Sequence, residues 1–193
     1  KVYKPLLGFE HLHGVSLQMG NMKQTHAETL KWRRLSASSG RRWVVCLDEI
    51  GPADVGVRPD ADDPNHDDVR KHALWGNLMA GGAGCEWYFG YKYPHNDLNC
   101  EDFRSRDRLW DITRYARQFF EQLPLERMAP DDSLVEGHAW CFASPGELYV
   151  VYLPEGGGSR LRLAEGTYTV QWYNPRTGGA PRSGSVTTLN GPG

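Results

Sequence analysis

The stretch Trp43-Val44-Val45-Cys46-Leu47-Asp48-Glu49-Ile50-Gly51 decides the fold class, because an apolar run in it ends directly in two carboxylates. A strand that is apolar on both faces is typical of a parallel sheet covered by helices. The alternation of side chains along a strand predicts that Asp48 and Glu49 point to opposite sides. In parallel α/β sheets the ligand crevice forms at the carboxyl ends of the strands, so this strand end is a candidate site.

The sequence around this stretch alternates between strand-like and helical patterns. Helices are predicted where apolar residues recur at helical spacing, and Thr25 and Glu28 have the spacing of a capping box. The predicted strands are 12–19, 43–47 and 85–89, and the predicted helices are 25–38, 67–80 and 106–123. This alternation is the mark of β/α units with a parallel sheet, and it predicts an α/β domain of three such units over residues 1–123.

After Pro124 the pattern becomes all-β. Short strands are predicted between turn signals such as Ser144-Pro145-Gly146, at 138–143, 147–153, 159–163, 167–173 and 185–189. The sequence therefore predicts a second domain over residues 124–193, a small antiparallel β-sandwich.

The first part is too short to close a β/α barrel, which needs roughly 250 residues and eight strands. We therefore expect the strand at 12–19 to keep an unpaired edge, and an inner face with Val45 and Leu47 to lack partners. Self-association, or completion by other segments of a longer polypeptide, follows from this expectation. A start at Lys1, without Met or a leader, fits a fragment.

Composition excludes several classes of partner. A formal net charge of -2 argues against nucleic acid, because phosphate binding needs a basic face. No apolar run approaches the ~20 residues that cross a bilayer, so no membrane partner is predicted.

The acidic loop Asp60-Ala61-Asp62-Asp63-Pro64-Asn65-His66-Asp67-Asp68 invites a calcium hypothesis but lacks the glycine and terminal glutamate of an EF-hand. A solvated loop whose acids favour the next helix N-terminus is the preferred interpretation. We predict no metal and no cofactor.

The four cysteines show no C-x-x-C pair. Cys46 and Cys85 lie in apolar runs, as buried thiols do, and a Cys85–Cys100 disulfide stays an open alternative.

Three groups of residues are candidates for chemistry. Asp48 and Glu49 are either catalytic or a strand-end pair that caps backbone amides or makes a salt bridge. The aromatic run Trp87-Tyr88-Phe89 suits either stacking on sugar rings or core packing. The loop at 91–99 is either solvated surface or a substrate rim.

The two longest motifs resemble a known family. The segments at 43–51 and 74–91, the second reading Leu74-Trp75-Gly76-Asn77-Leu78 and ending Glu86-Trp87-Tyr88-Phe89-Gly90-Tyr91, are similar to the end of a clan A-type glycoside-hydrolase barrel, of the apiosidase-like group. The tail, with 146–153 and 168–179, resembles the module called the collagen-binding domain that follows such barrels.

The resemblance implies a fold, a function and roles for single residues. The chain would be the C-terminal portion of a TIM-type barrel, strands six to eight, from a secreted or periplasmic parent that cleaves a carbohydrate substrate. Glu49 then matches the nucleophile, with Asp48 as runner-up. Gln18 would orient Glu49 or a sugar hydroxyl, and the substrate pocket would be shaped by Trp87, Tyr88, His95, Asn96 and Asp97.

The same resemblance implies that the chain alone is inactive. A retaining hydrolase needs a second carboxyl ~5–5.5 Å from the nucleophile. In clan A that acid/base ends strand four, outside these residues. The alternatives from other classes are a carbohydrate- or protein-binding module without a catalytic role, and a β domain that only buttresses the barrel.

Overall fold

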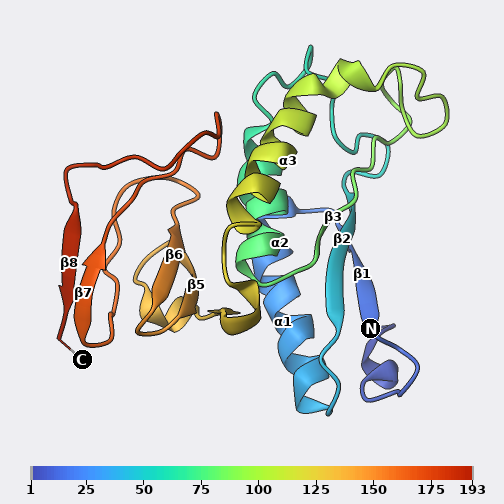
Figure 1. Ribbon diagram of the computed structural model, residues 1–193. Helices are drawn as coiled ribbons and strands as arrows, with labels where there is room; N and C mark the ends of the chain where they lie inside the picture. The colour runs from blue at the N-terminus through green and yellow to red at the C-terminus, as the bar shows by residue number, and fades with distance from the viewer. Residues whose placement is uncertain (1, 193) are drawn as a thin grey trace. The chain divides into compact units, whose positions relative to one another are not determined.

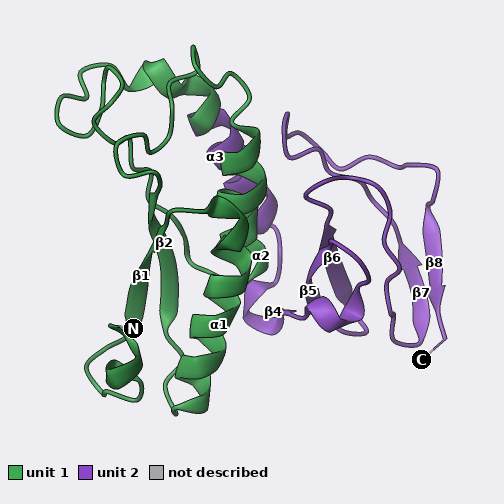
Figure 2. Ribbon diagram, turned by 180° about the vertical axis from the view of Figure 1, so that it is seen from behind, with its two compact units in different colours: residues 1–109 green, residues 110–193 purple. Residues whose placement is uncertain are grey.

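The computed structural model describes residues 2–192, which have a mixed α/β fold. They form two compact units, residues 1–109 and residues 110–193, drawn in two colours in Figure 2. The division falls inside α3 (Asp107–Phe120), whereas the predicted boundary follows residue 123.

Unit 1 contains a parallel sheet of three strands in the order β1 (Gly14–Met19), β2 (Val44–Ile50) and β3 (Gly84–Cys85) (Figure 1). The prediction of three parallel strands is confirmed. In the described part of the chain this sheet is open and does not close into a barrel.

Two helices lie on one side of this sheet in both Figure 1 and Figure 2. They are α1 (Thr25–Ser38) and α2 (Trp75–Met79), the latter preceded by a π-helical stretch at Val69–Leu74. The ring of Trp32 in α1 stacks on Trp43, which precedes β2, with 6.2 Å between the centroids. The apolar residues of the strands are therefore buried against helices on one face only.

The predicted capping box at the start of α1 is wrong. A 3-10 turn at Met22–Gln24 leads into α1, so the backbone is already helical at Gln24. An N-cap residue needs an extended backbone, which Thr25 does not have. Its hydroxyl is buried without a hydrogen-bond partner, and Glu28 pairs with Lys31 instead, at 2.7 Å.

Asn77 joins α2 to its neighbours. Its fully buried amide donates to the Thr29 hydroxyl at 3.2 Å and to the Val45 carbonyl at 3.4 Å, and accepts from the Gly84 amide at 3.0 Å. A Cβ on Gly82 would lie 2.3 Å from this amide, so the turn after α2 needs glycine there.

The face of the sheet opposite the helices differs from the expectation. Val45 and Leu47 were expected to lack partners, yet both are fully buried on the helical side. The open face instead carries Val44, which is 53% exposed, exposed Gln18, and the partly exposed Ser16 and Cys46. Period-two alternation places these residues together, and most of them are small or polar.

The third strand is shorter than the predicted 85–89. After Cys85 only the Glu86 amide continues the ladder, donating to the Leu47 carbonyl at 2.8 Å. The chain then runs against the segment after β2, where the Val57 amide donates to the Tyr88 carbonyl at 2.7 Å. Gly56 allows this approach, since a Cβ there would lie 2.3 Å from the Tyr88 carbonyl oxygen.

Unit 2 contains two small antiparallel sheets. One consists of β4 (Ala129–Pro130), β5 (Trp140–Ser144) and β6 (Leu148–Tyr152), and the other of β7 (Gly166–Thr169) and β8 (Thr188–Gly191). The rings of Tyr149 and Tyr168 meet edge to face, 5.4 Å between centroids, and connect the two sheets.

The predicted strand at 159–163 is wrong, because in that segment only a single bridge between Val135 and Leu161 forms. In α3 the side chains of Leu109, Ile112, Ala116 and Phe120 are buried. Further 3-10 turns lie at Lys4–Leu6, Phe103–Arg106, Leu125–Arg127 and Asp132–Leu134.

Candidate functional site

The candidate site lies at the carboxyl ends of the parallel strands. β1 ends at Met19 and β2 at Ile50, and their last residues pair in register, Gln18 with Glu49 and Met19 with Ile50. Trp87 follows β3 by two residues, outside the ladder. Because parallel strands end on the same side of a sheet, this edge gathers the sequence-predicted residues from all three strands.

A bulge in β2 sets the direction of its two carboxylates. Leu17 pairs with Leu47 and Gln18 with Glu49, so Asp48 is one extra residue opposite β1. Leu47 and Ile50 are fully buried, whereas Asp48 and Glu49 between them are both partly exposed. The burial therefore departs from strict alternation at this point, because the bulge inserts one extra residue between the two buried positions.

Glu49 lies beside two of the predicted ligand-binding residues. Its backbone pairs with exposed Gln18. The pKa of Tyr88 is raised by partial burial and then by the negative charge of Glu49, with Asp97 contributing further. The Tyr88 hydroxyl donates to the Ala53 carbonyl at 2.6 Å, which fixes the ring next to this edge.

The charge of Asp48 affects two cysteine thiols, whereas that of Glu49 affects Tyr88. Burial raises the pKa of Cys46, and the charges of Asp48 and Glu86 raise it further. Burial also raises the pKa of Cys85, where Cys46 and Asp48 contribute. Both thiols are therefore protonated and unreactive at neutral pH. All four cysteines are free, so the alternative Cys85–Cys100 disulfide does not form.

The remaining predicted binding residues organise the loop after β3. Asp97 accepts the Phe89 amide at 2.8 Å, and the Asn96 side chain donates to the carbonyls of Tyr91 and Tyr93 at 3.3 and 2.9 Å. His95, at a positive φ of 54°, accepts the Asp102 amide on its Nδ1 at 3.2 Å. These three polar side chains fix the backbone of the loop. The side chains that surround them remain accessible and form its rim.

Arg106 is the residue at this loop that the sequence analysis missed. It is fully buried, and its guanidinium donates to the carbonyls of Val57 at 3.0 Å and His95 at 2.8 Å. The guanidinium also lies over the Phe89 ring, 4.2 Å from the centroid, and burial lowers its pKa. It holds together the two segments that follow β2 and β3. An arginine just before a helix carries no sequence signal for such a role.

The acidic loop is more ordered than the predicted solvated loop. Fully buried His66 contacts Asp60, with 2.7 Å between Nε2 and Oδ1, and its Nδ1 lies 3.8 Å from an oxygen of Asp63. Asp60 also accepts the Arg108 amide at 2.9 Å. The loop acids therefore serve a buried histidine as well as the next helix, where Asp67 pairs with Arg70.

Residues 2–192 contain neither a metal-binding cluster nor a membrane-spanning helix. No group of three or more histidine, cysteine or acidic side chains in this range is arranged to hold a metal ion. In the same range no helix has both the length and the apolar character to span a bilayer.

At this edge the Glu49 carboxylate lies on the open face of the sheet. The Gln18 amide and the Tyr88 phenol flank it. Such a carboxylate can act as a nucleophile or a base toward a ligand bound above the sheet. Comparison of the chain with protein-family models, with curated proteins and with solved structures finds no match.

Proposed function

We propose that this chain is the C-terminal part of a retaining glycoside hydrolase, its unit 1 being the last three strands of a TIM-type barrel, with Glu49 as nucleophile. The observation that supports this most is the β2 bulge, which leaves Glu49 partly exposed on the open face beside Gln18. In a barrel that face would be the inner one, where substrates bind.

In the proposed reaction a Glu49 carboxylate oxygen attacks the anomeric carbon and forms a glycosyl ester while the bond to the leaving group breaks. A proton must reach the leaving oxygen from a second carboxyl. We assign that acid/base to a strand outside these residues. Gln18 would orient Glu49, and Trp87 and Tyr88 would line the sugar subsite, with the rim from His95, Asn96 and Asp97.

The test compares a longer polypeptide, which supplies the other strands, with the 193-residue chain on a panel of aryl glycosides. The longer protein should turn over at least one, and the chain alone none. Glu49→Ala should lower kcat about a thousandfold or more. Added azide should restore turnover and yield a glycosyl azide, because azide replaces the missing nucleophile.

Asp48→Ala is the matched control, since it removes the neighbouring carboxylate. It should change kcat less than about tenfold. Azide rescue in Asp48→Ala rather than Glu49→Ala would transfer the nucleophile to Asp48. Turnover by the isolated chain that vanishes in Glu49→Ala would refute the assignment of the acid/base to another segment.

A further inference from the structure

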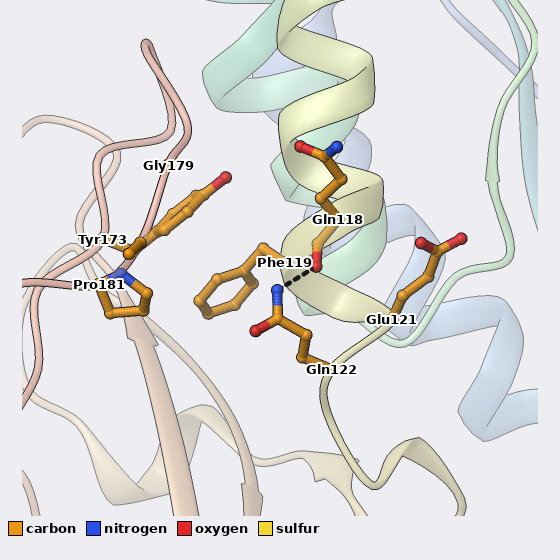
Figure 3. Close-up of a pocket in the computed structure, with 8 residues that line it drawn as sticks. Gln118, Phe119, Glu121, Gln122, Tyr173, Gly179 and Pro181 are labelled. Atoms are coloured by element: carbon orange, nitrogen blue, oxygen red, sulfur yellow. Dashed lines mark hydrogen bonds between the residues drawn. The ribbon is translucent and has the colours of Figure 1, made fainter.

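A second concavity lies within unit 2, far along the chain from Glu49. Its volume is about 520 Å³, within the range of roughly 300–1,000 Å³ of small-molecule clefts. One wall is the end of α3 and the turn after it, with Gln118, Phe119 and Gln122. The other wall is Tyr173 with the segment 179–181. Figure 3 shows Phe119 and Gln122 on the side of the helix end that is turned toward Tyr173 and Pro181.

The aromatic part of the lining is held in place. The rings of Phe119 and Tyr173 are tilted by 37°, with 4.6 Å between centroids. The Tyr173 hydroxyl donates to the Tyr115 carbonyl at 2.8 Å, so it fixes the ring and has given its only proton to the backbone. The concavity thus offers a rigid apolar surface without a phenol donor for a ligand.

The second wall is also preformed. Trp172 and Arg182 exchange two backbone hydrogen bonds of 2.8 Å and close the loop 173–181 at its base. Gly178 has a positive φ of 63°, and a Cβ there would lie 2.4 Å from the Tyr115 ring. The loop therefore seats against Tyr115 of α3 only because glycine occupies this position.

The polar part of the lining consists of side-chain amides and one carboxylate. Gln122 donates its Nε2 to the Gln118 carbonyl at 2.7 Å, and its Oε1 remains as an acceptor. Glu121 points away from Tyr173 in Figure 3, and its carboxylate lies 3.3 Å from Arg117. No cation lines the concavity in the described chain, so an anionic ligand has no counter-charge there.

These features point to a neutral ligand with flat C–H faces and several hydroxyls. We infer that the Phe119–Tyr173 concavity binds a neutral pyranose oligosaccharide. A sugar ring can place its C–H face on the rings, and its hydroxyls can donate to and accept from the Gln118 and Gln122 amides. A proline-rich peptide fits less well, because it has no N–H to donate to the amide oxygens of Gln118 and Gln122. This site does not depend on the role proposed for Glu49.

The test is isothermal titration of the full chain with cellotetraose, xylotetraose, mannotetraose and a decaproline peptide. At least one tetrasaccharide should bind. Phe119→Ala and Gln122→Ala should each raise its Kd about tenfold or more. Gln122 is exposed, so its variant keeps the fold even where Phe119→Ala does not.

The controls are Phe103→Ala, an exposed aromatic of unit 1, Gln171→Ala, an exposed amide of unit 2, and Glu49→Gln in unit 1, all of them outside the lining. All three should leave the Kd unchanged. The inference is overturned if the folded chain binds no tetrasaccharide, if decaproline binds in place of the sugars, or if Gln122→Ala leaves the Kd unchanged. A Kd that responds to Glu49→Gln would place the sugar at the sheet edge and overturn it as well.

Discussion

At the scale of single residues, Arg106 contributes more to the candidate site than its position in the sequence indicates. Its two carbonyl acceptors, on Val57 and His95, belong to the segments after β2 and β3. Arginine serves here because a planar guanidinium can donate in several directions at once, which a lysine ammonium at the end of a flexible stem does not reproduce.

We therefore predict that Arg106→Lys lowers the free energy of unfolding by about 2 kcal/mol, because buried carbonyls lose their donors. Urea unfolding followed by tryptophan fluorescence measures this change. Arg104→Lys is the matched control, since the Arg104 side chain is 70% exposed and should change stability by less than about 0.5 kcal/mol. Equal effects of the two variants would contradict the role given to Arg106.

Thiol reactivity gives a second prediction at this scale. Burial, with Asp132 and Asp131 nearby, raises the pKa of Cys141 to about 12, and the pKa values of Cys46 and Cys85 are also raised. A thiol stays mostly protonated at any pH below its pKa. At pH ~8 these three cysteines therefore hold little of the reactive thiolate. Cys100 is exposed.

Iodoacetamide should therefore modify Cys100 first in the folded chain, Cys46 and Cys85 more slowly, and buried Cys141 only after unfolding in urea. Peptide mass spectrometry reads the site of each modification. Rapid modification of Cys141 in the native protein would show that the β5 region opens more readily than its burial indicates.

At the scale of elements, the two faces of β2 differ although the sequence around them is apolar throughout. Val45 is fully buried on the helical face, and its neighbour Val44 is 53% exposed on the open face. Val45→Ala should cost about 1.5–3 kcal/mol of unfolding free energy, because a buried valine loses most of its apolar surface.

Val44→Ala should cost less than about 0.5 kcal/mol in the same urea titration, carried out at a concentration low enough for the chain to be monomeric. Both variants replace a valine of β2 with alanine. The difference between their losses of unfolding free energy therefore measures the effect of the sheet face alone. Similar losses for both variants would mean that the open face is covered in solution by a partner or by another part of the chain.

The same strand, β2, shows which structural features can be predicted from the sequence and which cannot. Strand and helix positions followed from apolar periodicity, so β1, β2 and α1 lie close to their predicted ranges. The bulge at Asp48 could not be predicted, because it depends on the register between β1 and β2 and leaves no local signal. The early end of β3 had the same cause, since Tyr88 and Gly90 pack against a segment more than thirty residues earlier.

Polar side chains were harder to assign than strands. Asp97 and Asn96 were chosen as binding residues because they lie in a polar loop, yet both bond to the backbone of that loop. Gln18 and Glu49 were chosen from strand ends, and the register brings them together. Strand ends were informative because a parallel sheet fixes where they meet, whereas a loop has no such constraint.

At the scale of the whole molecule, the open face and the free edge of β1 predict association. β1 is an edge strand that can pair with another chain, although its Ser16 carbonyl already accepts the Tyr3 hydroxyl, and Val44 adds exposed apolar surface. Size-exclusion chromatography with light scattering should give a mass above that of the monomer, rising with concentration. Val44→Lys should shift the mass toward the monomer. A monomer at every concentration, with one cooperative melt, would contradict the proposal of an incomplete barrel.

The most direct test of the central claim, that Glu49 is the nucleophile of a glycoside hydrolase, is covalent trapping. Fluorinated dinitrophenyl glycosides of several sugars are incubated with a longer polypeptide that supplies the other strands. Dinitrophenolate leaves without a proton, so the glycosyl ester still forms, and a fluorine at C2 of the sugar slows its hydrolysis so that the sugar stays attached to the nucleophile. Tandem mass spectrometry of the peptide spanning β2 should place this sugar on Glu49. A sugar on Asp48 or on any residue outside this chain, with Glu49 unmodified, would contradict the claim.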